Sequence, residues 1–96
     1  MLYLHGIGHF HPENVITNRF LAELDIGTDE GWIMERVGIR ERRTVLPLDY
    51  IRETKNRDAR EAYEVSLYTN AEMGAAAARM ALSRASLKSS DIGLVL

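Results

Sequence analysis

The sequence predicts an α/β fold in which a sheet is covered by helices on both of its faces. Residues 2–9 alternate between two sets of side chains in the manner of a strand, and an alanine-rich stretch over Met73–Ala85 has helical periodicity. The run Ile92–Leu96 is wholly apolar, which is typical of a strand buried on both faces by helices. A chain of 96 residues has room for one small domain at most.

The composition narrows the classes of function. Hydrophobic residues at 46% and charged residues at 27% are ordinary for a globular protein. The net charge of −2 gives no electrostatic reason to expect a nucleic-acid partner or an anionic membrane surface. No apolar run approaches the roughly 18 residues that span a bilayer, and the first residues lack the features of a signal peptide. The sequence contains no cysteine, which excludes a disulfide, a thiolate metal site and a cysteine nucleophile within these residues. We therefore expect a cytoplasmic protein without nucleic-acid or membrane partners.

The first predicted strand carries two glycines and leads into a turn. Gly6 and Gly8 leave one face of this strand bare, so another backbone or a ligand can approach closely. The sequence His-Pro-Glu-Asn at residues 11–14 predicts a turn. A short helix is expected after Asn18 and should close at Gly27. Its inward-facing residues are Phe20, Leu21 and Leu24.

A second helix is expected from Thr28 to Val37. Thr28 can accept hydrogen bonds from the backbone donors of the first turn, and Asp29 and Glu30 favour the positive end of the helix dipole. Gly38 then supplies a left-handed C-terminal cap. This pair of start and stop signals is the clearest local pattern in the chain.

The middle of the chain is rich in charge. Arg40–Leu46 is expected to be extended and partly exposed. Its arginines, Arg40, Arg42 and Arg43, suit either contact with phosphate or an acidic carrier protein, or protection of a strand edge by pairing with nearby acids; the second interpretation is favoured. Residues 47–68 mix both signs of charge, which predicts a solvated segment of broken helix rather than a binding patch.

The last third of the sequence predicts a helix followed by a strand. Thr69 and Glu72 form a capping box ahead of the helix over Met73–Ala85. A stripe of this helix is expected to pack in the core and consists of Met73, Ala76, Ala77, Met80 and Ala81. A strand at Ile92–Leu96 would expose an apolar edge if it stood alone, so we expect further chain to cover it.

Three segments in order resemble the opening of the β-ketoacyl–acyl carrier protein synthase III family, in the thiolase-like superfamily. They read GIGHFHPENVITN, GWIMERVGIRERR and DIGLVL. The resemblance implies that residues 1–96 are the N-terminal part of an incomplete thiolase-like condensing-enzyme domain, with a mixed sheet between helices. It leaves out residues 47–68, a charged insertion that indicates a specialised branch. It also implies acyl-CoA and acyl carrier protein as partners, with the remainder of the polypeptide, and a homodimer.

The family's chemistry, as the resemblance implies it, is decarboxylative condensation. An acyl group passes from coenzyme A to a cysteine, and malonyl–acyl carrier protein then attacks it. The family's catalytic cysteine, histidine and asparagine lie beyond the position of Leu96. We therefore assign no catalytic residue, and coenzyme A enters as part of the substrate rather than as a cofactor.

The resemblance places the adenine end of coenzyme A on Thr28, Trp32 and Arg36. These residues are four apart, so they line one face of the predicted helix. A tryptophan ring stacked on a base contributes about 1–3 kcal/mol in nucleic-acid systems, and a guanidinium group can contact phosphate. The alternative is that Trp32 anchors the helix on the core while Arg36 is solvated. Gly31 departs from the family pattern and loosens the helix beside the ring.

Other functions stay open at this point. A related acyltransferase could make an ester or an amide, and a non-catalytic coenzyme A-binding or interaction module could share the architecture. His9 and His11 stand two residues apart without a third ligand, so no metal site is assigned.

Overall fold

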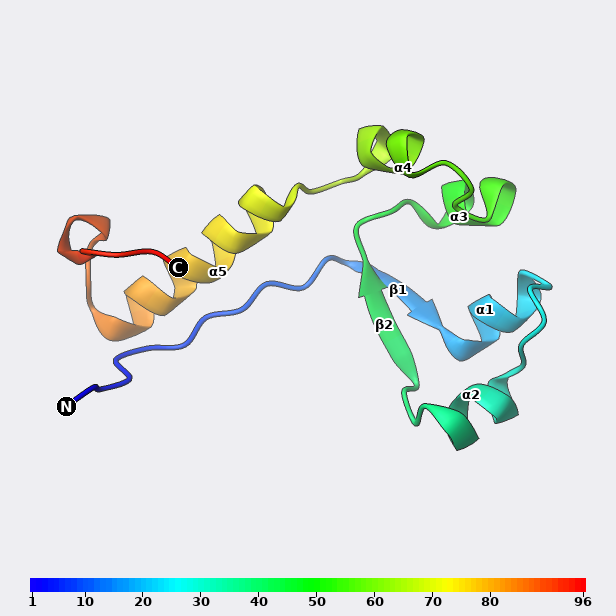
Figure 1. Ribbon diagram of the computed structural model, residues 1–96, viewed down its shortest axis with the longest axis horizontal. Helices are drawn as coiled ribbons and strands as arrows, with labels where there is room; N and C mark the ends of the chain where they lie inside the picture. The colour runs from blue at the N-terminus through cyan, green and yellow to red at the C-terminus, as the bar shows by residue number, and fades with distance from the viewer. The chain divides into compact units, whose positions relative to one another are not determined.

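The computed structural model describes all residues from Met1 to Leu96, in two compact units. One unit combines Met1–His11 with Thr69–Leu96, and the other is Pro12–Tyr68. The elements run in the order β1 (Asn14–Thr17), α1 (Asn18–Glu23), α2 (Glu30–Arg36), β2 (Glu41–Thr44), α3 (Leu48–Thr54), α4 (Ala59–Val65), α5 (Asn70–Ala85) and a 3₁₀ turn at Ser89–Asp91 (Figure 1).

The sheet of the Pro12–Tyr68 unit is a two-stranded antiparallel ribbon. β1 pairs with β2 in a register that sets Asn14 opposite Thr44 and Thr17 opposite Glu41. The prediction of an extended segment over Arg40–Leu46 is confirmed in β2. The strand β1 was not predicted, because it has only four residues and directly follows turn residues.

A small apolar core joins α1 to α3. It consists of Phe20, Leu24, Tyr50 and Ile51, all of them buried. The inward-facing side chains predicted for the helix after Asn18 are therefore confirmed at Phe20 and Leu24. Partly buried residues pack around this core, namely Ile16, Leu21, Leu46, Leu48, Ala62 and Val65.

The charged segment of residues 47–68 folds as the two short helices α3 and α4. The predicted break in the helix is confirmed, since Lys55 adopts a left-handed conformation after α3 and Asp58 caps the start of α4. The expectation that the segment is simply solvated is wrong. Tyr50 and Ile51 are apolar positions within α3 that face α1, so this segment supplies half of the four-residue core.

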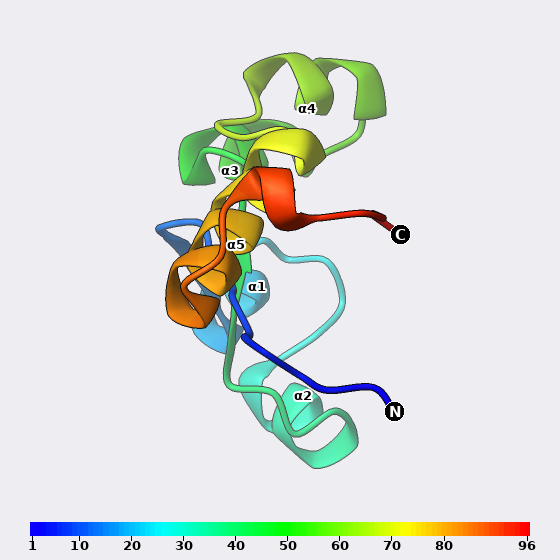
Figure 2. The ribbon, with the colours of Figure 1, turned by 90° about the vertical axis from the view of Figure 1, so that its left-hand side faces the viewer.

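Close backbone packing characterises the other unit. Residues 1–11 run alongside α5 (Figure 1, Figure 2). A Cβ atom built on Gly8 would lie 2.0 Å from the carbonyl oxygen of Ala77, and one built on Gly6 would lie 2.6 Å from that of Ala81. The predicted close approach at the two glycines is confirmed, and its partner is the small-residue face of α5. Arg84 adds a hydrogen bond of 3.0 Å to the carbonyl of Ile7.

The helix α5 begins as its capping signal indicates. The Thr69 hydroxyl accepts from the backbone N–H of Glu72 at 3.1 Å and lies 3.1 Å from the Glu72 carboxylate. The helix includes Asn70–Glu72 and so starts three residues before the predicted Met73.

Neither the strand predicted over residues 2–9 nor the apolar strand predicted at Ile92–Leu96 is formed here. Residues 2–9 and Ile92–Leu96 belong to no sheet, and the predicted mixed sheet with helices on both faces is absent. A strand requires a neighbouring backbone to pair with, and neither segment has one. Instead, the residues of 92–96 are exposed, with Leu94 at 73% and Val95 at 85%. The α/β character itself is present, on the ribbon and helices of the Pro12–Tyr68 unit. None of the helices combines the length and the hydrophobicity that crossing a membrane requires.

Candidate functional site

The helix α2 is held at both ends by local hydrogen bonds. Its N-cap is Asp29, whose Oδ1 accepts from the backbone N–H of Trp32 at 2.8 Å. The prediction that Thr28 caps this helix is wrong. A carboxylate is a stronger acceptor than a hydroxyl beside the positive end of a helix dipole, which favours Asp29 as the cap. The predicted C-terminal stop is confirmed, since Gly38 has φ +73° and its N–H donates to the carbonyl of Ile33 at 3.1 Å.

Two of the three predicted site residues lie on one face of α2. Trp32 and Arg36 are one turn apart, and both are exposed, Trp32 at 52%. The buried anchor of the helix is Ile33, at 5% exposure, so Trp32 does not take the core role of the alternative interpretation. The role of Trp32 and Arg36 in binding coenzyme A stays a prediction.

Thr28 lies two residues before the helix rather than in its first turn. Its side chain is half-buried, and the hydroxyl oxygen is shielded from solvent with no hydrogen-bond partner. Unpaired buried hydroxyl groups are uncommon in folded proteins because they lose their bonds to water. Thr28 therefore retains a polar group with unused hydrogen-bonding capacity, and its predicted contact with a base edge stays a prediction.

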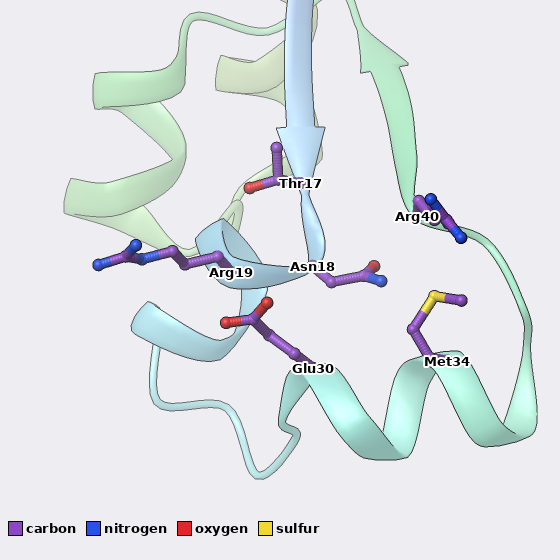
Figure 3. Close-up of a pocket in the computed structure, with 6 residues that line it drawn as sticks. All are labelled: Thr17, Asn18, Arg19, Glu30, Met34 and Arg40. Atoms are coloured by element: carbon purple, nitrogen blue, oxygen red, sulfur yellow. The ribbon is translucent and has the colours of Figure 1, made fainter.

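A cavity of about 380 Å³ lies between α1 and α2. Its lining residues are Thr17, Asn18, Arg19, Glu30, Met34 and Arg40 (Figure 3). Side chains advance by about 100° per residue along a helix, so Glu30 and Met34 project from the side of α2 roughly opposite Trp32. In Figure 3 the side chain of Arg19 extends away from Arg40, so the two guanidinium groups do not converge on a common point. This cavity is therefore separate from the face of Trp32 and Arg36, and it offers no joint anion site.

Two of the three arginines around β2 fasten the ribbon. The Arg42 guanidinium donates to the Asn18 side-chain oxygen at 3.1 Å, and that of Arg43 donates to the carbonyl of Pro12 at 3.1 Å. The expectation that nearby acids pair with them is wrong for these two bonds, whose acceptors are an amide and a carbonyl. Arg40 is exposed and lines the cavity.

The sequence predicts a helix after Asn18 and indicates no role for its side chain. In the structure Asn18 is the one buried polar residue, at 6% exposure. Its side chain donates to the carbonyl of Ile39 at 2.9 Å and accepts from Arg42. No local pattern in the sequence indicates these bonds, because their partners lie more than 20 positions away.

The two histidines considered as metal ligands lie near each other without completing a site. The rings of His9 and His11 have centroids 5.0 Å apart. No group of three or more histidine or carboxylate side chains occurs anywhere in the chain in an arrangement suited to a metal ion.

The chain is similar over most of its length to curated proteins that are named as acyl-carrier-protein synthases. A β-ketoacyl-[acyl-carrier-protein] synthase III of Oceanobacillus iheyensis is 36% identical over 91 residues, which are 95% of this chain and 23% of that protein. The protein of the same name from Alkalilimnicola ehrlichii is 46% identical over 65 residues, 65% of this chain and 20% of that protein. A 3-oxopimeloyl-[acyl-carrier-protein] synthase of Brucella abortus is 34% identical over 93 residues, 97% of this chain and 22% of that protein.

The chain thus spans about a fifth of the length of these curated relatives. No family model matches the chain. No solved structure matches it at a significant level.

Proposed function

From the premise that this chain is homologous to a segment of the β-ketoacyl-[acyl-carrier-protein] synthase III proteins, we propose that α2 forms one side of a coenzyme A site in an acyltransferase. The proposal depends on one observation above all: Trp32 is exposed, while the packing of α2 depends on Ile33. An exposed indole leaves apolar surface in contact with water, which is unfavourable unless a ligand or another surface covers the ring. Its flat face suits a purine, and Arg36 one turn away adds a cation for phosphate.

The reaction we propose is condensation through an acyl-cysteine. An acyl group passes from coenzyme A to a cysteine thiolate, which releases the coenzyme A thiol. Malonyl–acyl carrier protein then loses carbon dioxide, and the resulting carbanion attacks the carbonyl of the acyl-cysteine. The bond to the cysteine sulfur breaks, which releases the thiolate and leaves the β-ketoacyl product on the carrier protein. The 96 residues contain no cysteine, so they contribute substrate binding to this reaction and no nucleophile.

The proposed binding is tested by titrating coenzyme A into the full-length protein. We expect Trp32→Ala to weaken binding by about fivefold to a hundredfold, the range that corresponds to one stacked base. Met34→Ala is the matched control, since it shortens a partly exposed side chain on the opposite side of the same helix. Equal affinity for Trp32→Ala and the parent protein, with both folded, would refute the stacking role.

The chemical claim is tested by a product assay with an acyl-CoA and malonyl–acyl carrier protein. A β-ketoacyl product with release of carbon dioxide supports condensation. Formation of an ester or an amide from an oxygen or nitrogen acceptor would instead favour a related acyltransferase. Binding of coenzyme A without any transfer would favour a non-catalytic module.

A further inference from the structure

Asn18 ties the exit of α2 to the start of α1. Its side-chain N–H donates to the carbonyl of Ile39 at 2.9 Å, and its backbone N–H donates to that of Arg40 at 3.2 Å. Ile39 directly follows Gly38, the residue that ends α2. The amide oxygen of Asn18 accepts from Arg42 in β2 at 3.1 Å. One buried side chain thus fixes the path of the chain from Arg36 into the ribbon.

Little else holds α2 in place. The helix has seven residues, too few to be stable by itself in water, and Ile33 is its only buried residue. The chain enters it through a loop in which Asp25 and Gly27 both have positive φ. The cavity of Figure 3 is open to solvent and lies between α2 and α1, so it adds no buried contact that would hold the helix on that side. The hydrogen bonds of Asn18 are therefore a major constraint on the orientation of the helix.

We propose that Asn18 is a positioning residue, which orients the face of Trp32 and Arg36 toward coenzyme A without touching the ligand. This inference rests on the proposed function of α2. A ring held in one orientation before binding loses less conformational freedom when the ligand arrives. Loss of the bond to Ile39 would let the helix pivot about Ile33 and would spread Trp32 over several poses.

The test replaces Asn18→Asp, which keeps the size of the side chain and its acceptor for Arg42 but removes the donor to Ile39. The matched control is Asn14→Asp. Asn14 makes the same kind of bond, from its side-chain amide to the carbonyl of Leu46 at 3.0 Å, at the opposite end of the ribbon. Asn18→Ala, which removes the side-chain donor and acceptor without adding charge, covers the case in which a buried carboxylate unfolds the protein.

Two measurements are made on each folded variant. Trp32 is the single tryptophan of the 96 residues, so the fluorescence anisotropy of this chain reports the mobility of its ring. We expect lower anisotropy for Asn18→Asp and for Asn18→Ala, and a coenzyme A affinity about fivefold weaker, the change that corresponds to one ordinary hydrogen bond. Asn14→Asp is expected to lower thermal stability to a similar extent with both readouts unchanged.

The outcomes separate this inference from the proposed function. If Asn14→Asp and Asn18→Asp change the anisotropy and the affinity equally, Asn18 has only a general structural role and the inference is overturned. If the parent protein does not bind coenzyme A, the proposed function fails. A selective loss of anisotropy at Asn18 would then still support its control of the Trp32 ring.

Discussion

At the scale of single residues, the hydroxyl of Thr28 allows one substitution to test stability and the proposed binding role together. It is shielded from solvent and lacks a partner within the chain. Because an unpaired buried hydroxyl costs about 1–3 kcal/mol, Thr28→Val is expected to raise the free energy of unfolding by about 1 kcal/mol. In the proposed site the hydroxyl bonds the edge of the base, so the same change should weaken coenzyme A binding several-fold. Chemical denaturation and ligand titration measure the two effects.

The proposed role of Thr28 is supported if Thr28→Val raises stability and weakens coenzyme A binding. A gain of stability with unchanged affinity would remove Thr28 from the proposed site and leave Trp32 and Arg36 in it. A loss of stability would mean that the hydroxyl has a partner in the folded protein.

Glu13 is expected to make the stability of the fold depend on pH. The Tyr68 phenol donates to its carboxylate at 2.5 Å and lowers the pKa of Glu13; a backbone hydrogen bond and the charge of Arg43 act in the same direction. A carboxylate with a lowered pKa in the folded state stabilises the fold at pH values above its ordinary pKa. This contribution is lost as the pH falls through the folded-state pKa, because the unfolded chain binds its proton first.

We therefore expect Glu13→Gln to lower stability at neutral pH and to have little effect in acid. The measurement is the difference in free energy of unfolding between the parent protein and the variant, followed from pH 7 down through the ordinary range of a glutamate. A difference that stays constant over this range would contradict the assignment, since it would not depend on the ionisation of Glu13.

At the scale of elements, the contact between residues 1–11 and α5 depends on the absence of a side chain. A methyl group at Gly8 would overlap the backbone of Ala77 and Ala81, so Gly8→Ala must move the extended segment away from the helix. We expect a loss of about 1–3 kcal/mol in free energy of unfolding, which thermal and chemical denaturation can measure.

Gly74→Ala is the control for Gly8→Ala. Gly74 lies within α5, and a methyl group there would meet nothing within 4 Å. We expect this variant to be more stable by about 0.5–1 kcal/mol, since alanine favours the helix. Similar losses from both substitutions would show that helix α5 is not packed against the segment as the structure describes.

The helices and strands also show which features of the fold the sequence predicts and which it does not. Signals that act within a few residues were recognised: the stop at Gly38, the cap at Thr69 and the bare face at Gly6 and Gly8. Thr28 and Asp29 compete for one cap, and the sequence does not decide between two adjacent acceptors. The strands expected over residues 2–9 and 92–96 depend on pairing with other segments. The pattern of side chains in each segment predicts which faces would be buried in a sheet. It does not show which other segment would pair with it.

The same distinction applies to the candidate site. The spacing of Trp32 and Arg36 predicts a shared helix face, and the structure has that face. The hydrogen bonds of Asn18 connect residues 21 and 24 positions apart, so no local pattern could have predicted them. The position of the cavity beside α2 likewise depends on how α1 and α2 pack.

At the scale of the whole chain, residues 47–68 determine whether the Pro12–Tyr68 unit has a core. A mixed-charge segment could be trimmed at little cost if it were only a solvated insertion. Here Tyr50 and Ile51 of α3 pack with Phe20 of α1 and with Leu24, the residue that caps α1. The Tyr50 hydroxyl donates to the carbonyl of Asp58 at 3.1 Å. The segment therefore stabilises α1, whose first residue is Asn18.

The final prediction tests this core with two substitutions, one in α3 and a matched control in α4. Ile51→Ala should lower the free energy of unfolding by about 2–5 kcal/mol, because it leaves a cavity among buried side chains. Tyr63→Ala in α4 removes a larger side chain that is 74% exposed, and it should change stability by no more than about 0.5 kcal/mol. Urea denaturation followed by circular dichroism measures both. Equally small effects would restore the interpretation of 47–68 as a solvated insertion; the expected contrast would mean that α3 supplies part of the core that supports α1.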